Sequence, residues 1–154
     1  MRDQLPANPY RYGLLAVAFA QLGVTLQALF APRSFYEDFP LGRGWVQEYP
    51  SYNSHLIVDY GAFTLGALLA LVIAAVWLDR RVVQLAIVSW LAGATVHLGS
   101  HVATIDRYGT GDAIGNLVAL GLAVVLPGWL LLKSRSRQRP QERSNVAAED
   151  PGRA

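Results

Sequence analysis

Long apolar stretches without charged residues alternate with short charged segments along this chain. Asp, Glu, Lys and Arg are absent from residues 12–32, 60–78, 82–105 and 113–132. Each stretch is close to the roughly 20 residues that an α-helix needs to cross about 30 Å of hydrocarbon. The pattern therefore predicts an all-α membrane protein, an antiparallel four-helix transmembrane bundle with helices at about 12–32, 53–78, 82–105 and 112–132.

Composition agrees with one membrane domain and excludes several classes of site. Hydrophobic residues make up 53% of the 154 residues and charged residues only 16%, which is apolar and charge-poor for a globular protein. The absence of cysteine excludes disulfides, thiolate zinc sites and cysteine-bound iron–sulfur clusters.

The first apolar stretch is longer than the core of a secretory signal and is interrupted by Gln21 and Gln27. We therefore expect it to be a retained helix.

The distribution of Lys and Arg predicts the orientation in the membrane. Ten of the 13 lie in the N-terminal segment 1–11, the link 79–81 and the tail 133–154. Since positive residues accumulate on the cytoplasmic side, we expect a plasma-membrane protein with both termini in the cytoplasm and an outer loop at 33–52. The tail has no apolar periodicity, so we expect it to be disordered. Its basic residues explain the pI near 9.2, and no nucleic-acid-binding motif is present.

Two predicted helices each contain a pair of metal-competent side chains four residues apart. The pairs are His55/Asp59 and His97/His101, which include all three histidines. A spacing of four places both members of a pair on one side of a helix, and ionisable groups inside a bilayer are costly and usually mark a working site. Because only a short link joins these two helices, we expect them to be antiparallel neighbours, with the two polar pairs at comparable depth where they could face each other.

Three imidazoles and one carboxylate would suit a first-row transition metal, with zinc, copper or iron as candidates. We therefore predict a metal site formed by His55, Asp59, His97 and His101. The residues expected to surround it or close over it from the aromatic outer loop and the last helix are Trp45, Tyr52, Asp112 and Asn116. Gln27 is expected to contribute from the first helix.

Other interpretations stay open. Asp112 and Asn53 precede helices and suit N-caps, and Asp59 could form a purely structural bond with a histidine of another helix. Without a metal, His97 or His101 could be an acid/base group acting on a lipid or terpenoid. The protein could also be a non-catalytic accessory subunit or assembly factor of a larger membrane complex, or a homo-oligomer. Pro127 is expected to kink the last helix and free the carbonyl of Ala123.

Two short motifs resemble a group of small actinobacterial four-helix membrane proteins. The first is a GRGW loop followed by a YNxHLxxDxG run, and the second is a pair of histidines one crossing later. The matching residues here are Gly42, Arg43, Gly44, Trp45, Tyr52, Asn53, His55, Leu56, Asp59, Gly61, His97 and His101. Ser54 and Val58 stand where the group's pattern would have an acidic and a basic residue. The resemblance implies this topology and emphasises these residues, but it implies no activity.

Overall fold

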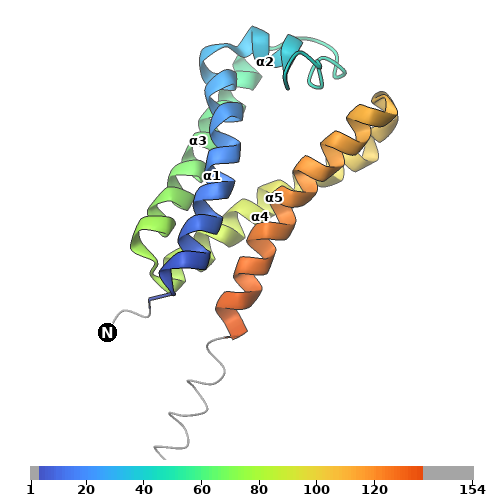
Figure 1. Ribbon diagram of the computed structural model, residues 1–154. Helices are drawn as coiled ribbons and strands as arrows, with labels where there is room; N and C mark the ends of the chain where they lie inside the picture. The colour runs from blue at the N-terminus through green and yellow to red at the C-terminus, as the bar shows by residue number, and fades with distance from the viewer. Residues whose placement is uncertain (1–3, 137–154) are drawn as a thin grey trace, which may run out of the picture.

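The computed structural model describes residues 4–136 as a set of helices (Figure 1). The long helices are α1 (Ala7–Phe30), α3 (Ser54–Trp77), α4 (Arg80–Ala103) and α5 (Thr110–Ser136). Two short elements lie between them, α2 (Pro32–Asp38) and the 3₁₀ helix η1 (Ile105–Arg107). The predicted all-α fold with four apolar helices is confirmed.

All four of these helices have the length and apolar composition needed to span a membrane. Large apolar side chains project outward from them, and Phe19, Phe63 and Val96 are each more than 70% exposed. Such surfaces require lipid around them. The protein is therefore a multi-pass membrane protein.

The helix limits differ from the prediction at both chain ends. α1 begins at Ala7, inside the predicted N-terminal segment, and α5 continues through residues 133–136, which were predicted to be disordered. Residues 137–154 of the predicted tail lie outside the described part of the chain. The loop predicted at 33–52 contains α2, which begins with a proline at its first position, where a missing backbone donor costs nothing.

α1 packs mainly on α3, and α4 packs mainly on α5. A methyl group added at Gly61 of α3 would lie 2.8 Å from Leu29 Cγ and 3.2 Å from Ala28 Cβ of α1. Only glycine allows the backbones to approach this closely. In the same interface the Thr25 hydroxyl donates to the Thr64 hydroxyl at 3.1 Å.

Side chains of α4 donate hydrogen bonds to backbone and side-chain groups of α5 and so join the two helices. Arg80 donates to the Ser134 carbonyl, and Gln84 donates to the Ser134 hydroxyl at 3.0 Å. Halfway along the helices, the Trp90 indole donates to the Ala123 carbonyl at 2.8 Å. Ala123 lies four residues before Pro127, so Trp90 satisfies the carbonyl that the proline cannot bond.

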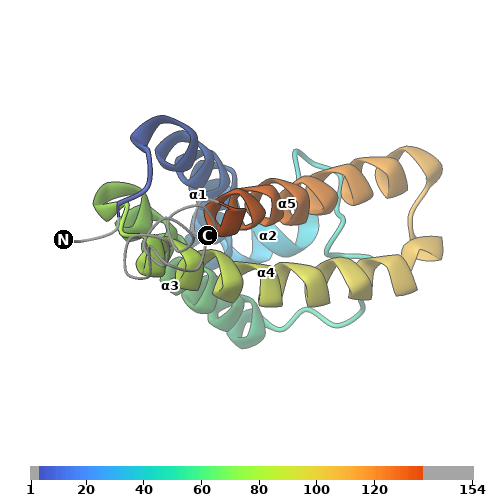
Figure 2. The ribbon, with the colours of Figure 1, turned by 90° about the horizontal axis from the view of Figure 1, so that it is seen from below.

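The two helix pairs meet at one end and diverge toward the other (Figures 1 and 2). We call the end where α1 begins and α5 finishes the terminal end, and the end with α2, residues 39–53 and η1 the loop end. The main apolar core lies toward the terminal end and includes Leu14, Leu71, Ile87 and Leu130. α3 and α4 are linked there through Leu78, which has a left-handed backbone, and Asp79, which caps α4.

α3 and α4 are neighbours, as expected, but neither is the other's main packing partner. α3 and α4 do make contact, but α3 packs more extensively on α1 than on α4. Their link holds them together at the terminal end only, and they separate toward the loop end (Figure 1). The His55/Asp59 pair on α3 and the His97/His101 pair on α4 both lie near the diverging ends.

Candidate functional site

A cavity of about 890 Å³ lies between the α1/α3 pair and the α4/α5 pair. Its walls are mainly apolar, with contributions from Val17 and Val24 of α1, Ile57 of α3, and Leu120 and Leu126 of α5. Aromatic side chains also line it, among them Phe35, Phe39, Trp45, Tyr49, Tyr60 and Trp90. Ligand sites in proteins have this size and this mixture of an apolar wall with a few polar groups.

The GRGW motif bends the segment that covers the loop end of the cavity. Gly42 and Gly44 have positive φ angles of 80° and 66°, a region that glycine adopts without steric cost. Gly44 is also buried, and a Cβ there would lie 3.2 Å from the Glu37 carbonyl oxygen. The two glycines thereby direct Arg43 and Trp45 toward α5.

Asp112 of α5 accepts hydrogen bonds from both residues. The Trp45 indole donates to its Oδ1 at 2.7 Å, and Arg43 Nε donates to the same oxygen. This ion pair raises the pKa of Arg43. Asp112 is the third residue of α5, and its carboxylate is engaged by the loop, so its role is to fasten the loop to the helix. Asn53 does have the predicted capping role, since its side chain accepts from the Leu56 amide at 3.1 Å.

Tyrosines fix the same segment to α4 and η1. The Tyr49 hydroxyl lies 2.6 Å from the Thr104 hydroxyl, and the Tyr108 hydroxyl donates to the Trp45 carbonyl at 3.1 Å. Burial raises the pKa of Tyr108, and the neighbouring Tyr49 adds to the effect. Tyr108 therefore stays protonated at physiological pH and keeps its donor role.

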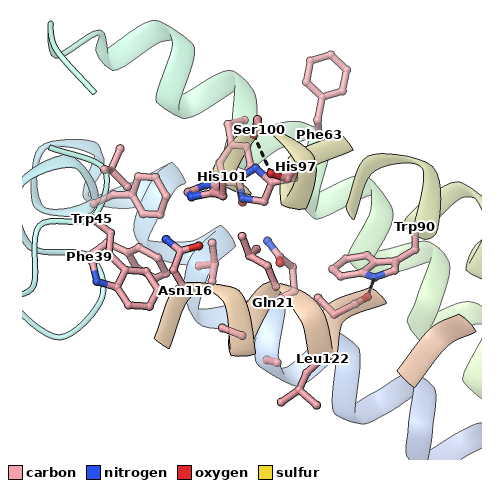
Figure 3. A pocket seen from close by; sticks show the side chains of 18 of the residues that line it. Gln21, Phe39, Trp45, Phe63, Trp90, His97, Ser100, His101, Asn116 and Leu122 are labelled. Atoms are coloured by element: carbon pink, nitrogen blue, oxygen red, sulfur yellow. Dashed lines mark hydrogen bonds between the residues drawn. The ribbon is translucent and has the colours of Figure 1, made fainter. Parts of the chain in front are cut away.

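His97 and His101 face the cavity from α4 (Figure 3). Their ring centroids are 4.6 Å apart in an edge-to-face arrangement. His101 Nδ1 lies 3.4 Å from the Tyr108 hydroxyl, which is a long contact for a hydrogen bond. The ring of His101 is also flanked by Tyr49, at a centroid distance of 5.9 Å. This predicted pair is thus brought together at the cavity.

His55 and Asp59 form a separate pair on α3. His55 Nε2 lies 3.4 Å from Asp59 Oδ2, with side-chain exposures of 87% and 46%. Asp59 borders the cavity, whereas His55 is not among the residues that line it. The partner of Asp59 is therefore on its own helix and not on another one.

The four predicted ligands do not assemble in one place. Within residues 4–136, no group of three or more His, Cys, Asp or Glu side chains is close enough to hold a metal ion. The divergence of α3 from α4 toward the loop end separates the two pairs. Metal binding by His55, Asp59, His97 and His101 stays a prediction.

The other predicted residues have different surroundings. Trp45 and Asn116 line the cavity. Tyr52 instead packs against Tyr36 of α2, and the Arg33 guanidinium lies 4.6 Å from the centre of its ring. Gln27 donates to the Ser34 hydroxyl at 3.2 Å and so joins α1 to α2.

Gln21 of α1 is a cavity residue that the sequence interpretation did not single out for the site. It lies between apolar residues of the first crossing, and a polar residue inside such a stretch is the signal that could have identified it. Its amide Nε2 reaches the Thr25 hydroxyl only at a long 3.5 Å. In Figure 3 its amide and that of Asn116 lie across the cavity from His97 and His101.

Asn116 is 1% exposed. Neither its amide nitrogen nor its amide oxygen has a hydrogen-bond partner among the described residues. Asn116 is close enough to the Tyr108 hydroxyl to lower the pKa of Tyr108. Burial and the neighbouring Tyr49 raise that pKa by more. That hydroxyl nevertheless bonds the Trp45 carbonyl instead. The cavity thus has a polar end composed of two imidazoles and two amides.

Comparisons with protein-family models, curated protein sequences and solved structures give no match for this chain. The function must therefore be argued from the geometry of the cavity.

Proposed function

We propose that this protein binds a lipid-like molecule inside the membrane. The apolar part of the molecule occupies the space between the two helix pairs, and its polar part lies among His97, His101 and Asn116. The observation that supports this proposal is the cavity of about 890 Å³ with mainly apolar walls and a few polar groups gathered at one end. The cavity is bounded by helices that themselves require lipid, so an apolar ligand can reach it from the bilayer.

Two variants that differ only in position test this proposal. Ala20 of α1 and Ala92 of α4 are both exposed, but Ala20 lines the cavity and Ala92 does not. In Ala20→Phe the larger side chain occupies ligand space, and in Ala92→Phe it faces lipid. We expect saturable binding of an apolar fluorescent probe by the purified wild type and Ala92→Phe, and at least about tenfold weaker binding by Ala20→Phe. Equal binding by all three proteins, or none by the wild type, would refute the proposal.

We further propose that the loop end lies outside the plasma membrane and that both termini are cytoplasmic, in line with the Lys and Arg distribution. The chain contains no cysteine, so single cysteines report orientation directly. In intact cells a membrane-impermeant maleimide should label Gln47→Cys in the loop but not Asn8→Cys at the start of α1. The opposite labelling pattern would reverse the orientation.

Metal binding is a second candidate, favoured by the adjacent His97 and His101 rings. Zinc sites normally have three or four protein ligands, so this pair would need ligands from solvent or from the bound molecule. Stoichiometric metal in the purified protein that is lost in His97→Ala and His101→Ala would support this candidate. Metal-free wild-type protein, with unchanged stability of both variants, would exclude it.

The accessory-subunit hypothesis predicts a different result in the cell. Affinity purification at native expression should recover the chain with one invariant larger membrane partner. Recovery of the chain alone, or as a homo-oligomer, would count against that hypothesis and leaves the lipid-binding proposal in place.

A further inference from the structure

The buried amide of Asn116 is the polar group that the fold itself does not use. It is 1% exposed, it lines the cavity, and neither of its polar atoms has a hydrogen-bond partner in the described part of the chain. Leaving a buried donor and acceptor unpaired is unfavourable, and such groups in native proteins call for an explanation. A ligand with oxygen atoms at this position would provide it.

Further hydrogen-bonding groups face Asn116 across the cavity. Figure 3 shows the imidazoles of His97 and His101 on one side and the amides of Asn116 and Gln21 on the other. These side chains come from α4, α5 and α1, so they surround the space instead of approaching it from one direction. Each imidazole has one donor and one acceptor nitrogen when neutral, and each amide has both functions. A ligand head can therefore be bonded from two opposite walls.

The charges around the cavity disfavour an anionic head. Within residues 4–136, no Lys or Arg lines the cavity, and its single acidic residue, Asp59, lies 3.4 Å from His55. A phosphate or carboxylate in an apolar cavity needs a paired cation or several strong donors. The guanidinium of Arg43 in the covering segment is engaged by Asp112.

Aromatic side chains at the same end favour a flat head. Phe39, Trp45 and Tyr49 from the covering segment and Tyr60 from α3 all line the cavity near the polar groups. The rings of Phe39 and Trp45 are already arranged edge to face at 6.4 Å. Aromatic rings pack favourably on other flat rings in offset or edge-to-face geometry.

We propose that the ligand is an isoprenoid quinone. Its ring is flat and uncharged, its two carbonyl oxygens project from opposite edges, and its tail is a long apolar chain. The Asn116 amide donates to one oxygen and a histidine N–H from the opposite wall donates to the other. In the reduced form, the Asn116 carbonyl and the unprotonated imidazole nitrogen accept from the hydroxyls. This inference rests on the proposed lipid-binding function and specifies the chemical class of the ligand.

Three ligands with the same decyl tail test the head group in the full-length protein. Decylubiquinone has the quinone oxygens, decylbenzene has a flat ring without them, and decyl phosphate has an anionic head. Each competes with the apolar fluorescent probe for binding. We expect the wild type to bind decylubiquinone roughly ten- to a hundredfold more tightly than decylbenzene, as two hydrogen bonds would give.

The variant Asn116→Leu should lose most of the preference for decylubiquinone over decylbenzene. It should still bind decylbenzene, and that binding shows that the variant is folded. Val118→Leu is the matched control, because Val118 lies on the same helix but is exposed. His97→Phe preserves a ring without its hydrogen-bonding atoms and should also lose the preference. An unchanged preference in Asn116→Leu and His97→Phe, or tightest binding of decyl phosphate, would overturn the quinone assignment. Failure of all three ligands and the probe to bind the wild type would instead refute the lipid-binding proposal.

Discussion

The Asn116→Leu substitution should make the ligand-free protein more stable and should also weaken ligand binding. The side chain is fully buried on α5 and lines the cavity without a hydrogen-bond partner among the described residues. Leucine has the same branching and number of side-chain heavy atoms as asparagine but no polar atoms, and its bulkier methyl groups can extend into the cavity that residue 116 lines. The change therefore removes a buried amide that lacks a hydrogen-bond partner among the described residues. It does not create a large void.

The size of the effect follows from the cost of an unpaired buried polar group. That cost is about 1–3 kcal/mol, so ligand-free Asn116→Leu should be more stable by about that amount. For a chain of this length each kcal/mol corresponds to roughly 2–4 °C in Tm, which gives a rise of roughly 2–12 °C. A ligand at a hundred times its Kd adds about 2.7 kcal/mol to a protein that binds it. With decylubiquinone, the wild type should gain this stabilisation and the variant should gain far less.

Thermal unfolding in one detergent, followed by tryptophan fluorescence with and without decylubiquinone, measures both effects. Val118→Leu should behave like the wild type in both conditions. The reasoning fails if ligand-free Asn116→Leu unfolds at a lower temperature than the wild type while Val118→Leu does not. That result would mean that Asn116 stabilises the fold through a partner and is not reserved for a ligand.

Three further predictions, the first with a matched control substitution, test how the cavity is built. Gly61→Ala should destabilise the α1/α3 pair by about 1–3 kcal/mol, because its methyl group would lie 2.8 Å from a side chain of α1. Gly66→Ala on the same helix, with nothing within 4 Å, should be neutral or stabilising by up to about 1 kcal/mol. Equal effects on Tm would contradict this packing. Trp90→Phe should lower stability by about 1–3 kcal/mol, since it leaves a partly buried carbonyl without its donor. An unchanged unfolding temperature would show that this bond contributes little. Asp112→Asn removes the charge that binds Arg43 and weakens the attachment of the loop to α5, so it should speed tryptic cleavage after Arg43. Cleavage at the wild-type rate would show that this ion pair does not hold the loop in place.

The four crossings and several local bonds were predictable because they depend on neighbouring residues. An uncharged stretch of about 20 residues must satisfy its backbone hydrogen bonds within one helix, so hydropathy alone located all four spans. The capping role of Asn53 follows from its position before a helix. The unbonded carbonyl of Ala123 follows from Pro127, although the sequence did not reveal that Trp90 would be its donor.

The candidate site was predicted only in part. The spacing of His97 and His101 correctly placed both on one side of a helix, and the structure turns that side toward the cavity. The same spacing of four places His55 next to Asp59 on one side of α3. Spacing within a helix does not determine which other helix that side faces. Asn116 and Trp45 were expected near the site and line the cavity, whereas Tyr52 and Gln27 contact α2 and its surroundings.

The sequence by itself determined how many helices cross the membrane, roughly where they begin and end, and which polar residues they hold. These properties follow from transfer free energies and helical spacing, which act along one segment at a time. Only the tertiary structure decided that α1 pairs with α3, that α4 pairs with α5, and that a cavity opens between the pairs. In lipid no hydrophobic force selects helix neighbours, so close packing selects them, as at Gly61, where α3 meets α1. That packing separates the two polar pairs and leaves Asn116 buried across the cavity from His97 and His101.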